Sequence, residues 1–486
     1  MKCAPALAAL FLFIFFAPAL ADSAARVPGA YVSSSQHPRV FVSQSDLSDF
    51  VTRINRQDSF SSQKFARLSS LVKADVSNNV MWDAAYSGCD IDIYLYTFSI
   101  EETRGYASDV RSEDTIRSEM GLPVASKPPA GAAMVASRLA LYAALVKAGA
   151  RASTGAPTPD QAAALAKRIL MACAGHGFRD QNGNYLRFTR QFCDQNKAVT
   201  PAVQSAVGLQ ISRGVVYSVN AQELLQSLAD LSPAEEKQLN AFHANMYELI
   251  RDGLNSHFDL IKMPCDRYSN HVGSQLVGLL ATARLLDHRQ KFLAALYGDD
   301  PSIHVELPWT TYFSKAIYGE AQDPNQCSAN IGADGSTSSP SYQTSATAPG
   351  EIEDRYRNAN PLQAIGHSMG TLEYLYTAAD IMKSAGLDAY SYRGTHKQSI
   401  ENATEYYACY ARTVGFKKTV TAYQAAGCAD FQQYVGKIVN DEEPSILMGT
   451  SRFPGNKAIT ALDQRAKEES LSDKSIDTIR FGRWTN

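Results

Sequence analysis

The stretch "TPDQAAALAKRILMACAGHG", which runs from Thr158 to Gly177, carries the signals of a complete helix. Threonine is a favoured N-cap residue, and proline is favoured at the first helical position. Gln161 follows three residues after Thr158, as in a capping box. Apolar residues then recur at spacings of three and four, which is the period of one helix face. We therefore expect a helix that begins after Thr158 and packs on an apolar core.

The same signals recur along the chain. Ser232 is followed by Pro233 and Glu235, and Ser43 is followed by Asp46. Because clear β alternation is scarce, the sequence predicts an all-α protein. Helical spacing of apolar residues is found in "GAAMVASRLALYAALVKAG" (131–149), "HVGSQLVGLLATARLLD" (271–287) and "GTLEYLYTAADIMKSAG" (370–386).

The arrangement of these helices favours one architecture. Antiparallel helix pairs without a fixed-period repeat are typical of an incomplete α/α toroid, a barrel of helical hairpins around a central cleft. The longest irregular stretch, about 323–360, is rich in Ser, Gly, Pro and Thr, and loops of this length are commonly functional. We expect residues 37–486 to form one α/α-toroid domain with long loops at its site. A plain helical bundle or solenoid is the alternative.

Composition excludes some classes of protein. The chain has 486 residues, of which 45% are hydrophobic and 20% charged, an ordinary balance for a soluble globular protein. The formal net charge of −3 argues against a nucleic-acid partner, which would favour a basic excess. A local basic cleft for a polyanion is still compatible with this charge.

The N-terminus has the pattern of a signal peptide over residues 1–21. Lys2 precedes the apolar run Ala6–Phe16, and Ala19–Ala21 fits the small-residue cleavage rule. Later stretches are too short or too polar for a membrane anchor. We expect a secreted or periplasmic protein in which residues 22–36 form a flexible lead.

Export makes disulfides possible. The chain has eight cysteines, and seven remain without Cys3 of the signal peptide. Because seven is odd, at least one of them must stay a free thiol. Cys409 and Cys428 are the local candidates for a pair. The others are Cys89, Cys173, Cys193, Cys265 and Cys327.

"GHSMG", Gly366 to Gly370, matches the nucleophile elbow of serine esterases, which needs a strand before it and a helix after it. The preceding "RNANPLQAI" has two Asn and a Pro and does not alternate like a strand. The only later histidine is His396, and nothing resembles the rest of a doubly wound sheet. We therefore expect Ser368 on a helix face, with glycines that let helices approach closely.

Three other stretches are candidates for a site. In "CDRYSNHVGSQL", Asn270 and His271 stand where a loop enters an apolar helix. A helix N-terminus disfavours protonated histidine, and an adjacent amide can donate to a carboxylate. The structural alternative is that Asn270 only caps the helix.

The second stretch is "GEIEDRYRNANP" (350–361), and the third is "RFTRQF" (187–192). Arginines in both can bind carboxylates with a bidentate fork. A solvated charge run and a plain surface loop are the respective alternatives.

"HPRVF" near the N-terminus, the Asn-His pair that enters a helix, and the E-x-x-x-R-x-R loop before another helix together resemble the alginate lyase superfamily. The similarity runs from about residue 37 to 435, and the order of its short motifs carries it. The resemblance implies an α/α-toroid polysaccharide lyase that acts on an anionic, uronate-containing polysaccharide such as alginate, polymannuronate or glucuronan.

The resemblance also implies site residues. Asn270, His271 and one of Arg355 or Arg357 would surround the uronate carboxylate, while a tyrosine or histidine would act as base and acid. The window after the arginines, "NANPLQAIGH", lacks the family's tyrosine and ends in His367. Tyr356, Tyr268 and Tyr342 are the other candidates for that role, and Arg187, Arg190, Tyr268, Tyr342 and Glu353 are expected to bind substrate.

The chemistry is consistent with these residues. Hydrogen bonds that neutralise the carboxylate acidify the C5 proton, so a nearby base can remove it. This chemistry needs no cofactor or metal, and neither a calcium-loop spacing nor H-E-x-x-H occurs in the sequence. A glycoside hydrolase that uses Glu353, Asp354 or Asp266 is one alternative. An exported carbohydrate-binding protein without catalysis is the other.

Overall fold

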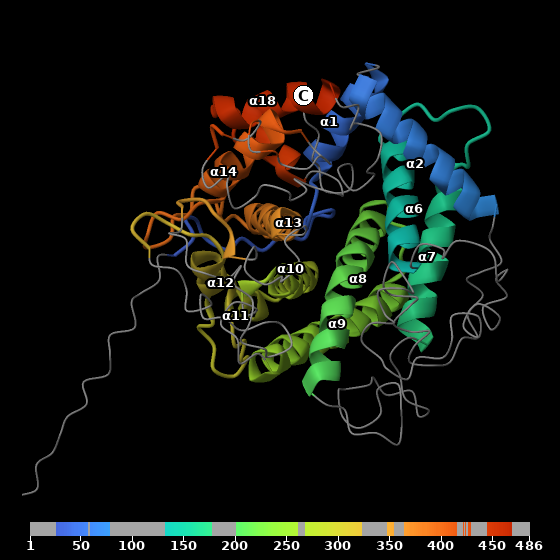
Figure 1. Ribbon diagram of the computed structural model, residues 1–486. Helices are drawn as coiled ribbons and strands as arrows, with labels where there is room; N and C mark the ends of the chain where they lie inside the picture. The colour runs from blue at the N-terminus through green and yellow to red at the C-terminus, as the bar shows by residue number, and fades with distance from the viewer. Residues whose placement is uncertain are drawn as a thin grey trace, which may run out of the picture.

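The computed structural model describes residues 26–56, 59–77, 132–176, 201–260, 268–322, 348–353, 364–415, 421, 423, 426–428 and 445–468. Within these residues the protein is helical, and extended pairing is limited to two isolated bridges, so the predicted all-α class is confirmed (Figure 1). The helices are α1 (Gln44–Asn55), α2 (Ser59–Ser77), α6 (Ala132–Lys147), α7 (Pro159–His176), α8 (Pro201–Ser227), α9 (Pro233–Leu260), α10 (Asn270–Leu285), α11 (Arg289–Tyr297), α12 (Trp309–Ala316), α13 (Ala364–Ser384), α14 (Ile400–Thr413), the 3-10 turn η6 (Ser445–Leu447), α17 (Met448–Arg452) and α18 (Lys457–Glu468).

The predicted capping boxes are present at three helix starts. At α7, the Gln161 backbone N–H donates to Thr158 Oγ1 at 3.2 Å, and the Thr158 N–H donates to Gln161 Oε1 at 2.9 Å. Ser232 and Glu235 make the same reciprocal pair before α9, and Ser43 with Asp46 does so before α1. These bonds satisfy backbone donors that a helix leaves unpaired, which is why the sequence signal was reliable here.

Helices α8 and α9 form an antiparallel hairpin. Side chains from the start of one helix meet those from the end of the other, as antiparallel packing requires. The pairs are Gln226 with Glu236 (2.6 Å), Gln222 with Asn240 (2.7 Å), Ser218 with His243 (2.9 Å) and Ser205 with His257 (2.8 Å).

Helix α10 lies at the centre of the described fold. It packs against α8, α9, α11 and α13, and α6 packs against both α7 and α8 (Figure 1). Every residue from Val272 to Leu285 is buried. The core therefore holds α10 on all sides, and only its first residues, Asn270 and His271, remain partly exposed.

The "HPRVF" stretch connects two helices of this core. His37 Nδ1 lies 2.9 Å from Glu223 Oε1 on α8, and Arg39 Nη2 donates to the Leu285 carbonyl at the end of α10 at 2.7 Å. Val40 is fully buried. The motif thus fastens the N-terminal segment to the two helices that carry much of the core.

Residues 26–36 belong to the segment for which the sequence predicts a flexible lead, and part of this segment makes contacts with the body of the protein. Val27 is buried, the Val32 N–H donates to the Ala385 carbonyl at 2.8 Å, and the Asp388 N–H donates to the Pro28 carbonyl at 2.8 Å. Gly29, with φ +101°, lies so close to the carbonyl of Gly386 that a Cβ would clash with it. The segment is therefore packed against the end of α13.

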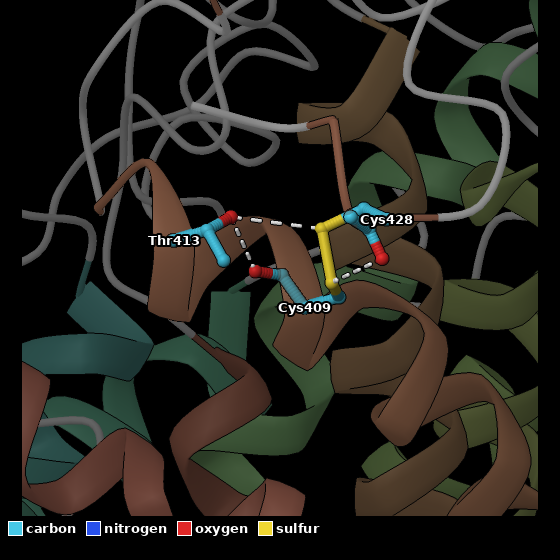
Figure 2. The surroundings of a disulfide bond; sticks show 4 residues. Cys409, Thr413 and Cys428 are labelled. Atoms are coloured by element: carbon cyan, nitrogen blue, oxygen red, sulfur yellow. Dashed lines mark hydrogen bonds between the residues drawn. A yellow bond between two sulfur atoms is a disulfide. The ribbon is translucent and has the colours of Figure 1, made fainter. Parts of the chain in front are cut away.

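The predicted disulfide between Cys409 and Cys428 is confirmed, with Cα atoms 5.7 Å apart (Figure 2). Thr413 Oγ1 donates to the Cys409 carbonyl at 2.8 Å and lies 3.6 Å from Cys428 Sγ. Cys173 is a buried thiol. The remaining cysteines lie outside the described residues, as does the predicted signal peptide.

In the described ranges, none of the helices has both the length and the apolar character that a membrane span would need.

Candidate functional site

The "GHSMG" stretch is helical throughout. Gly366–Gly370 lies inside α13, and Ser368 is fully buried. A nucleophile elbow needs its serine exposed on a sharp turn. The structure therefore confirms the prediction that Ser368 belongs to a helix face, and it contradicts the esterase alternative.

The start of α10 places Asn270 for a role other than capping. Ser269 is the N-cap residue, and its carbonyl accepts hydrogen bonds from the Val272 N–H at 3.1 Å and the Tyr312 hydroxyl at 3.2 Å. Asn270 is the first residue of the helix proper, so the capping alternative is wrong. Its side-chain amide instead reaches α13, where Nδ2 lies 3.5 Å from His367 Nδ1.

A glycine on α13 makes this approach possible. A Cβ at Gly370 would lie 3.0 Å from Asn270 Nδ2, closer than nearly all such contacts. Gly370 is one turn beyond His367, on the face of α13 that packs against α10. The predicted close approach of helices is thus confirmed at this glycine.

The exposed residues of α13 form one stripe. In its first three turns Gly366, His367, Gly370, Glu373 and Tyr374 are partly exposed, while the residues between them are buried. Spacings of three and four place these residues on one helix face. Asn270 and His271 at the start of α10 are also partly exposed.

The contact between Asn270 and His367 joins a side-chain amide to an imidazole. An amide nitrogen donates, so the contact is a hydrogen bond in the tautomer in which His367 Nδ1 carries no proton. Of the predicted site residues, Asn270 and His367 are in contact, and His271 follows Asn270 on α10.

Tyr268 and Glu353 are the other predicted site residues within the described ranges. Tyr268 precedes α10, is partly buried and packs against the core. Glu353 is fully buried and accepts a hydrogen bond from the Tyr318 hydroxyl. Glu351 is also fully buried, and its carbonyl accepts from the Tyr318 N–H at 2.8 Å. The alternative interpretation of this stretch as a solvated run of charges is therefore wrong for these two glutamates. The role of Glu353 in substrate binding stays a prediction.

Six predicted site residues lie outside the described residues, together with two carboxylates of the hydrolase alternative. They are Arg187, Arg190, Tyr342, Arg355, Tyr356 and Arg357, and the carboxylates are Asp266 and Asp354.

Sequence reasoning missed two residues beside this site. They are Tyr374 on α13 and Arg213 on α8, and the two side chains interact electrostatically. Burial raises the pKa of Tyr374, and the charge of Arg213 opposes that shift. The available signal was the position of Arg213, a lone charge in an apolar helical window that we did not single out.

No known protein-family profile and no curated protein matches the chain. Among solved structures, the chain is similar to an alginate lyase from Bacteroides ovatus, with 10% identical residues and a TM-score of 0.48. The likeness covers 91% of this chain and 99% of that one. That protein belongs to the class that the sequence motifs resemble, but a likeness of this size says nothing about activity.

Proposed function

We propose that the protein is a polysaccharide lyase that cleaves a uronate-containing polymer by β-elimination. The observation that carries the proposal is the 3.5 Å approach of Asn270 Nδ2 to His367 Nδ1, two residues 97 positions apart in the sequence. Both had been predicted as site residues from motifs alone. Their partial exposure beside His271 gives a substrate access to an amide donor and two imidazoles.

Asn270 would bind the substrate carboxylate. An amide that donates to the carboxylate lowers the cost of the negative charge that develops there when C5 loses its proton. A well-placed donor of this kind contributes about 3 to 4 kcal/mol to the transition state. The predicted Arg355 or Arg357 would add a bidentate, charged contact to the same group.

His367 would remove the C5 proton. Because the Asn270 amide now occupies Nδ1, a carboxylate that takes over the amide would release this lone pair. The proton at C5 passes to Nδ1, the electron pair forms the C4–C5 double bond, and the bond from C4 to O4 breaks. The leaving oxygen requires a proton, which one of the predicted tyrosines, Tyr268, Tyr342 or Tyr356, would supply, because the start of α10 disfavours a protonated His271. Substrate binding would thus activate the base, and no cofactor is needed.

Ultraviolet absorbance of the unsaturated uronate tests the proposal, with alginate, polymannuronate, polyguluronate and glucuronan as substrates. We expect absorbance to increase with at least one polymer. The rate of this increase should be about a hundredfold or more lower for Asn270→Ala and for His367→Ala. Ser368→Ala is the matched control on α13, since a buried serine should not affect elimination.

Two other outcomes would replace the proposal. New reducing ends without absorbance would indicate a glycoside hydrolase. Binding of a polymer without either signal would indicate a carbohydrate-binding protein.

A further inference from the structure

The start of α10 lacks the bond that usually fixes the first turn of a helix. Ser269 is the buried N-cap residue, but its hydroxyl makes no capping bond to the helix. A serine at this position commonly accepts from the backbone N–H of the second or third helical residue. The starts of α1, α7 and α9 have such bonds, so α10 differs from them in how its first turn is held.

Tyr312 of α12 supplies a bond from outside the helix. Its hydroxyl donates to the Ser269 carbonyl at 3.2 Å, and the N–H groups of Val272 and Gly273 donate to the same carbonyl at 3.1 and 3.3 Å. The Ser269 carbonyl and the Asn270 N–H belong to one planar peptide unit. A bond that fixes this carbonyl therefore also fixes the plane from which Asn270 begins.

Gly273 leaves the space that the Tyr312 hydroxyl occupies. A Cβ at Gly273 would lie 2.7 Å from the hydroxyl oxygen and 3.3 Å from Cζ of the same ring. Any side chain at this position would therefore push the hydroxyl away. Because Gly273 is about one turn beyond Asn270, the tyrosine contacts the same turn of α10 that carries the candidate site residue.

Helix α12 is itself firmly anchored. Tyr312 is fully buried, and Thr310 Oγ1 donates to the Leu296 carbonyl at the end of α11 at 3.1 Å. The ring of Phe313 packs edge-on against Tyr392, with centroids 5.0 Å apart. The hydroxyl is thus presented to α10 by an element that two other segments hold in place.

We propose that Tyr312 is a positioning residue for the site, whose hydroxyl fixes the first turn of α10 so that the Asn270 amide meets His367. The catalytic importance of this meeting rests on the proposed function, whereas the positioning does not. Asn270 Nδ2 and His367 Nδ1 are 3.5 Å apart, near the upper limit of a hydrogen bond, so a small rotation of the turn separates them. Tyr312 acts through the Ser269 peptide and does not contact the polymer.

The first test is Tyr312→Phe, which removes the hydroxyl and keeps the buried ring. The kinetic constants are compared with those of the wild type on a polymer that the protein cleaves. We expect kcat to fall by about tenfold, because a displaced amide stabilises the transition state less well. KM should stay within about threefold, because the tyrosine does not contact the substrate.

Tyr247→Phe is the matched control. Tyr247 is also fully buried, and its hydroxyl donates to a backbone carbonyl, that of Lys291, at 3.1 Å. Lys291 belongs to α11, which follows the C-terminal end of α10 in the chain. Both variants lose the same kind of bond, so their thermal midpoints should fall by similar amounts. Only Tyr312→Phe should lower kcat, and equal kcat values in the two variants would overturn the proposal.

Gly273→Ala tests the same contact from the side of α10. Its new Cβ should displace the hydroxyl and lower kcat by about tenfold. In Gly273→Ala/Tyr312→Phe the oxygen is absent, and the nearest remaining atoms are Tyr374 Cβ at 3.2 Å and the ring carbon at 3.3 Å. The double variant should therefore keep at least the kcat of Gly273→Ala. Losses that multiply in the double variant would contradict a shared action through the hydroxyl.

Nuclear magnetic resonance of protein with isotope-labelled histidine separates this inference from the lyase. The imidazole signals of His367 are those that disappear in His367→Ala. They should shift in Tyr312→Phe and Gly273→Ala, because a displaced Asn270 amide changes the surroundings of Nδ1, and should not shift in Tyr247→Phe. Signals that stay in place in all three variants would overturn the positioning role. If the wild type forms no unsaturated product, the lyase is rejected, and the expected pattern of shifts would still establish the role of Tyr312.

Discussion

His243 should make the protein acid-labile. It is fully buried on α9, with Nε2 2.9 Å from Ser218 Oγ and Nδ1 3.0 Å from the Leu239 carbonyl. Burial in this apolar setting lowers the pKa of His243 to about 3 from an ordinary value of 6.5. The folded protein therefore holds a neutral imidazole at pH values where the unfolded chain takes up a proton.

The sign of the effect follows from linkage. The contribution to stability is complete above pH 6.5 and is lost as the pH falls from 6.5 towards 3. The full shift corresponds to about 5 kcal/mol, and the part lost between about pH 7 and pH 5 is about 2 kcal/mol. A loss of this size is a large fraction of the stability of an ordinary domain.

The assay is urea denaturation of the wild type and of His243→Gln at pH 7 and pH 5. Glutamine can accept from the Ser218 hydroxyl but does not titrate. The wild type should lose about 2 kcal/mol more unfolding free energy between the two pH values than the variant does. His304→Gln, at a side chain that is 67% exposed, is the control and should keep the wild-type pH dependence. Equal pH dependence in wild type and His243→Gln would refute the reasoning.

Two further predictions concern the site and the disulfide. Gly370→Ala should displace the Asn270 amide, which would lie 3.0 Å from the new Cβ, and lower kcat/KM by about tenfold or more in the absorbance assay. Gly455→Ala has open space around its Cβ and should leave kcat/KM unchanged, so an equal loss in both variants would contradict the role of the close approach. Reduction of Cys409–Cys428, which are 19 residues apart, should lower the unfolding free energy by about 3 kcal/mol in guanidinium denaturation. Denaturation curves that overlap with and without reductant would contradict this prediction.

Local signals made the helices predictable from the sequence. The boxes at Thr158 and Ser232 depend on residues three positions apart, so the sequence contains the whole interaction. The pair Cys409–Cys428 is predictable for a similar reason, because few residues separate its members. The packing of residues 26–32 was missed because its partners lie near residue 385, and nothing in a polar lead identifies a distant carbonyl as its acceptor.

The site was predictable in its parts and not in its geometry. Motif order singled out Asn270 and His367, but their contact depends on how α10 crosses α13 and on the missing Cβ of Gly370. A surface charge run was one interpretation of Glu353 and its charged neighbours, but Glu353 is buried and accepts a hydrogen bond from the Tyr318 hydroxyl, which comes from another segment. Charge in the sequence reports the type of a side chain and does not report what covers it.

The polar residues that interrupt buried helices connect the fold to the proposed chemistry. Arg213 interrupts the buried residues of α8, Asn270 precedes the buried run of α10, and His367 and Tyr374 are partly exposed in the first three turns of α13. Apolar periodicity selects these helices for the core, so polar residues at core-facing positions are costly unless they bind something. Helix α10 packs against both α8 and α13, and this packing brings Asn270 into contact with His367 (Figure 1). The proposed chemistry would thus lie where the apolar pattern of α10 and α13 is interrupted, and the sequence marks these interruptions without showing that they meet.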